Sequence, residues 1–108
     1  MSESVSTPRI SSPYLDSHVG RNVIIVGKVT QLRGEIAVLD SDGNVTVNLD
    51  RDAHLISGNG AQVIGKVNPD LTVKVLTSKD LGPDVDYSLV KSVVEATQQH
   101  RSLFVFDN

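Results

Sequence analysis

The sequence predicts an all-β barrel of five strands followed by one C-terminal amphipathic helix. Runs rich in Val, Ile, Leu and Thr recur at short intervals between residues 22 and 79, and most of them alternate apolar with polar side chains. A period of two is typical of a sheet with one buried and one wet face. After Pro83 the apolar spacing becomes helical. At 108 residues, of which 39% are hydrophobic, the chain can form one domain with one modest core.

The segment before the first strand is polar. Residues 1–13 are rich in Ser and Pro, so we expect them to be flexible. Residues 14–19 could form one helical turn that ends at Gly20 in a left-handed conformation. The expected organisation is therefore a flexible segment over 1–13, a barrel over 14–80, a helix over 84–101 and a tail over 102–108.

The predicted strands cover residues 22–32, 35–40, 44–50, 61–68 and 71–79. Asp42-Gly43 is a strong hairpin signal, because both residues tolerate positive φ. The first and fourth strands contain the similar stretches IVGKV and VIGKV, each with a glycine in mid-strand. Such glycines favour a closed, sharply bent barrel, although a chance likeness in a Val-rich chain is an equal alternative. We expect these two strands to pair antiparallel, with Gly27 near Gly65. The longer loop over 51–60 could hold one helical turn.

The predicted helix carries two adjacent apolar stripes that together cover about half of its circumference. One stripe consists of Tyr87, Val90, Val94 and Thr97, and the other of Leu89, Val93, Ala96 and His100. Packing on a single barrel needs a stripe of only about 100°. The helix is therefore expected to face its own barrel and a partner. The expected partner-binding residues are Tyr87, Leu89, Val90, Val93, Val94, Ala96, Thr97, Phe104 and Phe106, although Arg101 and Ser102 could end the helix before the last two.

Catalytic and metal-binding patterns do not stand out in the sequence. There is no cysteine, and the three histidines are far apart without metal-ligand spacing. Residues 40–44 resemble the start of a calcium loop, but the glutamate that should end it is replaced by Arg51. The sequence predicts no enzyme, no metal, no cofactor, no small-molecule substrate and no membrane span. An enzyme site hidden in the 51–60 loop is a weaker alternative.

Nucleic-acid binding is only weakly indicated. The net charge is −3, and none of the predicted strands carries an aromatic residue on which a base could stack. Stacking contributes roughly 1–3 kcal/mol per base, so most of the usual affinity for single strands is missing. The candidates are Lys28, Arg33, Lys66 and Lys74, of which the three lysines could form a weak basic row.

Four stretches of the sequence resemble one family in order and spacing. They are residues 7–29 (TPRISSPYLDSHVGRNVIIVGKV), 40–49 (DSDGNVTVNL), 61–76 (AQVIGKVNPDLTVKVL) and 84–96 (DVDYSLVKSVVEA). Together they resemble the small, third subunit of replication protein A, a heterotrimeric single-stranded DNA-binding complex. The resemblance implies an OB-fold in a non-catalytic assembly subunit of that complex, which acts in DNA replication, repair and recombination in the nucleus.

The same resemblance implies particular partners. The middle and large subunits would join this chain through a three-helix bundle, and single-stranded DNA would be bound mainly through them. Two alternatives remain open from the residues alone. One is an autonomous OB-fold that binds single-stranded DNA or RNA. The other is the small OB subunit of a telomere-capping complex, which shares nearly every feature.

Overall fold

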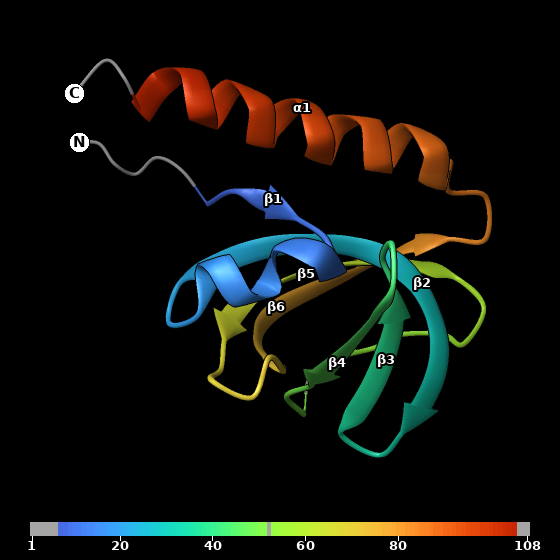
Figure 1. Cartoon of the computed structure of the whole chain (residues 1–108). Coiled ribbons are helices and arrows are strands. Elements are labelled where there is room, and N and C mark those ends of the chain that lie inside the picture. Colours follow the sequence, from blue (N-terminus) through green and yellow to red (C-terminus); the bar gives the residue numbers. More distant parts are fainter. Residues whose placement is uncertain (1–6, 52, 106–108) are drawn as a thin grey trace.

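The computed structural model describes residues 7–51 and 53–105, with side chains to residue 98. The described chain forms a curved sheet with one long helix beside it (Figure 1). The elements are β1 (Arg9–Ile10), the 3-10 helix η2 (Ser12–His18), β2 (Asn22–Arg33), β3 (Ile36–Asp40), β4 (Asn44–Asn48), β5 (Gly60–Val67), β6 (Val73–Gly82) and α1 (Tyr87–Val105). The five predicted strands correspond to β2 through β6, each within a few residues of its expected bounds.

The sheet closes into a barrel through β2. Its strand order is β1-β2-β3-β4-β6-β5, and an additional pairing of β2 with β5 completes the ring. Because β2 has 12 residues, its first half can pair with β5 while its second half pairs with β3. Closure leaves few free sheet edges, which is the usual way for a small antiparallel sheet to avoid edge-to-edge aggregation. The predicted all-β barrel with a C-terminal helix is confirmed.

The expected antiparallel pairing of β2 with β5 is confirmed. The prediction that Gly27 and Gly65 lie next to each other is wrong. Gly65 faces Val23, and Gly27 faces Ala61. The two glycines are therefore four positions apart along the ladder, or about 13 Å. Each glycine allows a different close approach. A Cβ at Gly27 would lie 2.8 Å from the carbonyl oxygen of Asp40, and one at Gly65 would overlap the carbonyl oxygen of Lys74.

The core lies inside the barrel and is built from the alternate residues of the strands. Val23, Ile25 and Val29 of β2 are fully buried in this core. The β2 residues that point to the outside of the barrel are not part of the core. The other strands contribute in the same way, through Ala37, Leu39, Val45, Val47, Ala61, Val63, Val67, Val73 and Val75. No aromatic side chain is among the fully buried members of the described core, so branched aliphatic residues fill it.

The expectation of a flexible segment up to residue 13 is wrong for its described part. Ile10 is fully buried, and β1 pairs parallel with β2. The backbone N–H of Ile24 donates to the carbonyl of Pro8 over 2.9 Å, and that of Ser12 donates to Ser41 over 2.9 Å. The physical reason is the length of β2. On one edge of β2, the strand β3 pairs only with residues 28–33. The backbone groups of the earlier β2 residues on that edge therefore need another partner, and β1 supplies it.

The turns follow the sequence signals more closely than the long loop does. Asp42 and Gly43 both have positive φ at the β3–β4 hairpin, and Gly20 has a φ of 82° just after η2. In the loop between β4 and β5, the described residues form turns and contain no helix. The helical turn considered there is not present in the described part of the loop.

The helix α1 starts later and ends later than expected. The side chain of Asp86 accepts a hydrogen bond from the backbone N–H of Leu89 over 3.1 Å, so Asp86 caps the first turn. The helix then continues past Arg101 and Ser102 to Val105, because neither residue breaks a helix. Phe104 therefore falls within α1, whereas Phe106 lies outside the described residues.

Candidate functional site

The two apolar stripes of α1 have different surroundings. In the first stripe, Val94 is only 3% exposed, and Tyr87, Val90 and Thr97 are half-buried. In the second, Leu89 is 60% exposed and Val93 is 41% exposed, and Ala96 is also exposed. The first stripe thus packs on the barrel of the same chain, and the second is uncovered. The side chain of His100 lies outside the described part.

The start of α1 is fixed to the barrel by close packing. A Cβ at Gly60 would overlap the Cγ2 atom of Val85 and would lie 3.0 Å from the hydroxyl oxygen of Tyr87. The absence of a side chain at this first position of β5 therefore lets the segment before α1 approach the sheet closely. Burial, followed by the nearby negative charge of Asp40, raises the pKa of the Tyr87 phenol. The phenol therefore stays neutral at ordinary pH.

A single ion pair connects α1 to the β3–β4 turn within the described part of the chain. The Nζ atom of Lys91 lies 3.6 Å from a carboxylate oxygen of Asp42. Both side chains are well exposed, so the pair adds at most a small stabilisation. Packing at Val94 and at Gly60 is therefore the main reason that α1 keeps its place on the barrel.

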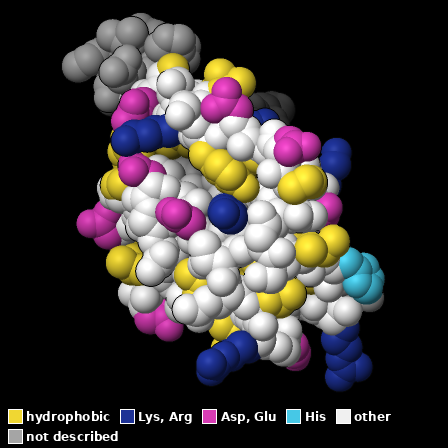
Figure 2. All heavy atoms as spheres, turned by 90° about the vertical axis from the view of Figure 1, so that its right-hand side faces the viewer, with side chains coloured by type: hydrophobic (Ala, Val, Ile, Leu, Met, Phe, Trp, Pro, Cys, Tyr) yellow, Lys and Arg dark blue, Asp and Glu magenta, His cyan; other side chains and the backbone are white. Residues whose placement is uncertain are grey.

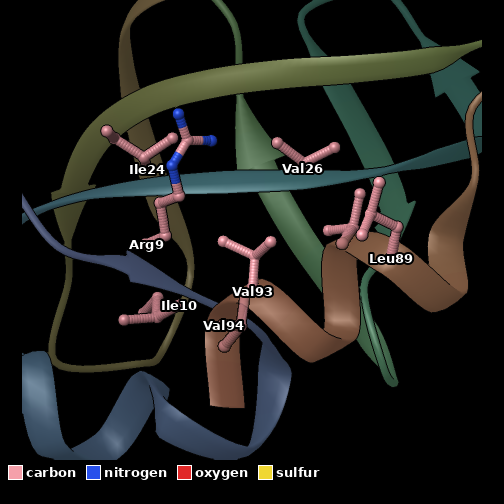
Figure 3. A pocket seen from close by; sticks show the side chains of 8 residues that line it. Arg9, Ile10, Ile24, Val26, Leu89, Val93 and Val94 are labelled. Carbon is pink, nitrogen blue, oxygen red and sulfur yellow. The ribbon is translucent and has the colours of Figure 1, made fainter. Parts of the chain in front are cut away.

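An apolar groove of about 310 Å³ separates the exposed stripe of α1 from the outer face of β1 and β2. Figure 3 shows Leu89 and Val93 pointing from the helix toward Val26 and Ile24 on β2. The full lining is Arg9, Ile10, Ile24, Val26, Leu89, Val90, Val93 and Val94. We call this feature the helix groove. Its volume is about twice that of a 150 Å³ protein cavity that accepts benzene, so it has room for one or two large apolar side chains.

The chemistry of the helix groove suits binding rather than catalysis. Arg9 is the one ionisable residue that lines it, and the other lining residues are all aliphatic. Over the described residues, no three His, Cys, Asp or Glu side chains come close enough to hold a metal ion. Within the same described residues, no helix is both long and apolar enough to cross a membrane.

The structure separates the candidate nucleic-acid residues. All four are exposed, but Lys28 is six positions along β2 from Asn22, the partner of Lys66. That offset corresponds to about 20 Å, and Arg33 lies still farther along the strand. Only Lys66 and Lys74 are neighbours, since they face each other directly across β5 and β6. The expected row through Lys28 is therefore wrong.

The sequence reasoning missed Arg9, because it assigned residues 1–13 to a flexible segment. The structure places Arg9 beside Ile24 on the outer face of the sheet, and its guanidinium extends across β2 between Ile24 and Val26 (Figure 3). A two-residue strand is too short to show a period in the sequence. The single apolar residue Ile10, next to Arg9, was the one available signal.

A closed five-stranded barrel with an added helix defines an OB-fold protein, and the uncovered stripe of that helix indicates a subunit of a larger assembly. Comparison with known families identifies which one. The chain belongs to the replication factor A protein 3 family, whose model matches residues 1–104.

Individual relatives agree with this family. Replication factor A protein 3 of Schizosaccharomyces pombe is 35% identical over 98 residues, which cover 91% of this chain and 94% of that protein. A chain in the structure of U. maydis replication protein A bound to single-stranded DNA is 33% identical, with a TM-score of 0.83. That match covers 91% of this chain and 94% of the other. The resemblance found in the sequence is confirmed.

The telomere alternative has weaker support. A chain of the S. pombe Stn1–Ten1 complex superposes with a TM-score of 0.73 over 90% of this chain and 96% of its own length. Its sequence identity is only 19%, so the match shows a shared fold and no more. The higher identity to replication factor A protein 3 decides between the two interpretations.

Proposed function

We propose that this chain is a non-catalytic assembly subunit of a heterotrimeric replication protein A complex and acts in the nucleus in DNA replication, repair and recombination. In this proposal α1 joins a three-helix bundle with one helix from the middle subunit and one from the large subunit. The supporting observation is the uncovered stripe of Leu89, Val93 and Ala96, all three of which are exposed. Leu89 and Val93 also line the helix groove.

The exposed stripe can supply a useful share of the association energy. Complete burial of a Val or Leu side chain contributes about 1.5–3 kcal/mol. Since Leu89 is 60% exposed and Val93 is 41% exposed, covering these two residues would contribute roughly 2 kcal/mol. Covering the apolar walls of the groove would add to this. Soluble chains rarely leave such a patch uncovered, which favours a partner at this surface.

Single-stranded DNA is expected to contact the assembly mainly through the partner subunits. No aromatic residue occurs in any of the six strands of the described sheet, and the net charge of the chain is −3. The usual combination of a positive groove and stacking platforms is therefore absent from these strands. This favours an assembly role over an autonomous nucleic-acid-binding module.

The test is a double substitution that changes only the uncovered stripe. We expect Leu89→Asp with Val93→Asp to prevent assembly, because a bundle interior offers no partner for the new charges, at a cost of several kcal/mol. Val94 is a poor choice, since it packs on the barrel and its change would also detach the helix. The measurement is co-expression with the middle and large subunits, followed by gel filtration of the complex.

A matched control separates loss of the interface from loss of the helix. Ser88→Asp with Ser92→Asp adds the same two charges at the same four-residue spacing, at exposed positions one step back along the helix. This variant should assemble like the wild type. The proposal fails if the Leu89 and Val93 variant still elutes as a full heterotrimer.

A further inference from the structure

Two of the four prolines follow a hydroxyl-bearing residue, in the pairs Thr7-Pro8 and Ser12-Pro13. A proline has a fixed φ and no backbone N–H, and proline-directed kinases select their acceptor by a proline at the next position. The pair of residues is a short motif, so accessibility in the fold decides which hydroxyl a kinase can reach. Phosphoryl transfer needs the acceptor oxygen in line with the leaving group, and therefore an acceptor on an accessible segment.

Ser12 is held by the fold. It begins the 3-10 helix η2, and its backbone N–H donates to the carbonyl of Ser41 over 2.9 Å. Its Oγ atom packs against Gly43, where an added Cβ would lie 2.9 Å from it. A kinase would have to unfold the start of η2 and separate it from the β3–β4 turn before this hydroxyl reached a γ-phosphate. Ser12 is therefore not an accessible acceptor.

Thr7 has the opposite environment. It is exposed and lies two residues before β1. The proline after it disfavours a helical conformation and keeps its backbone extended. The segment is nevertheless held in place, because the carbonyl of Pro8 accepts a hydrogen bond from the backbone N–H of Ile24 over 2.9 Å. Thr7 is thus an accessible hydroxyl at a defined place beside β2.

A phosphate on Thr7 would have a cation within reach. In an extended segment, side chains two positions apart lie on the same side, and two residues span about 7 Å. Arg9 is two positions after Thr7, and its guanidinium extends across β2 between Ile24 and Val26 (Figure 3). No carboxylate of the described residues forms an ion pair with Arg9. Its guanidinium can therefore turn to a phosphate and bind it through two hydrogen bonds.

The face on which α1 begins offers no competing cluster of cations. Figure 2 shows that its lysine and arginine side chains are scattered among acidic ones. A phosphate is attracted over a distance by a surface with one sign of charge, which this mixed face does not provide. A phosphate on Thr7 would therefore be bound by its own neighbour, Arg9.

We propose that Thr7 is a phosphorylation site for a proline-directed kinase and that Arg9 binds the resulting phosphate. The Oγ1 atom of Thr7 attacks the γ-phosphorus of ATP, the bond from that phosphorus to the bridging oxygen of ADP breaks, and the hydroxyl proton passes to the catalytic base of the kinase. The new group carries about −1.5 to −2 charges at pH 7. Since Arg9 is the one ionisable residue that lines the helix groove, the modification changes the net charge beside that groove from positive to negative.

The first test is treatment of the folded full-length chain with a purified cyclin-dependent kinase and ATP, followed by mapping of the phosphate by mass spectrometry. We expect one phosphate, on Thr7. Thr7→Ala should remove the modification and Thr7→Ser should restore it, whereas Ser12→Ala should leave it unchanged. The proposal is overturned if Thr7 stays unmodified or if Ser12 is modified at a comparable rate.

The second test measures the contact with Arg9. A nearby cation lowers the second pKa of a phosphate, which is about 6 without a partner. In the phosphorylated chain, titration by phosphorus NMR should give a pKa roughly half a unit lower than in the phosphorylated Arg9→Gln variant, as expected for an exposed ion pair. Arg33→Gln removes the same charge at the other end of β2 and should leave that pKa unchanged.

Equal pKa values with and without the Arg9 guanidinium would refute its role as the phosphate ligand. Both tests use the free chain and need no other subunit. A failure of the assembly role would therefore leave this site standing, and a failure of the site would leave the assembly role standing.

Discussion

Val93 and Val94 are adjacent and chemically identical, yet the structure predicts opposite consequences for their replacement by alanine. Both line the helix groove, but Val94 is only 3% exposed and packs on the barrel, whereas Val93 is 41% exposed. Val94→Ala should destabilise the free chain with little direct effect on the partner surface. Val93→Ala should leave the free chain nearly unchanged and weaken assembly.

The size of the difference follows from burial. Removing two buried methyl groups costs about 1.6 kcal/mol, and an unfilled cavity adds to this. Alanine is the better helix former by about 0.6 kcal/mol, which offsets part of the loss at both positions. The net cost is therefore about 1–2 kcal/mol for Val94→Ala. For Val93→Ala it is within about 0.5 kcal/mol of zero, because less of the side chain is buried.

The assay is urea unfolding of the free subunit, together with hydrogen exchange along α1. Helix propensity changes equally in the two variants, so their difference reports burial alone. We expect faster exchange in α1 for Val94→Ala, since the helix would detach more often from the barrel. Equal stability of the two variants, or a larger loss for Val93→Ala, would refute the assignment of the two stripes.

Two other predictions concern the barrel and DNA. Gly60→Ala should cost roughly 2 kcal/mol, because its Cβ would overlap the Cγ2 atom of Val85 and crowd the Cβ atom of that residue, which moves only with the backbone. Gly65→Ala should cost roughly 3 kcal/mol, because its Cβ would meet the backbone of Lys74, and denaturation of both variants measures the difference. The free chain should bind single-stranded DNA weakly and with strong salt sensitivity; tight binding of the monomer at physiological salt, by fluorescence anisotropy, would contradict this.

The barrel was predictable because its signals are local. Alternation in the strands and the Asp42-Gly43 turn depend on a few neighbouring residues, and the structure confirms them. Pairing across the barrel is not local. The likeness of IVGKV and VIGKV suggested that Gly27 and Gly65 meet, but the structure pairs Gly65 with Val23. The two registers differ by four residues, and an even shift leaves the same faces buried, so the alternation in the sequence could not choose between them.

The candidate site was only half predictable. The width of the apolar arc on α1 predicted two contact surfaces, but the sequence could not assign either stripe to the barrel. That assignment depends on the close approach at Gly60 and on the docking of β1 beside β2. Both are tertiary features.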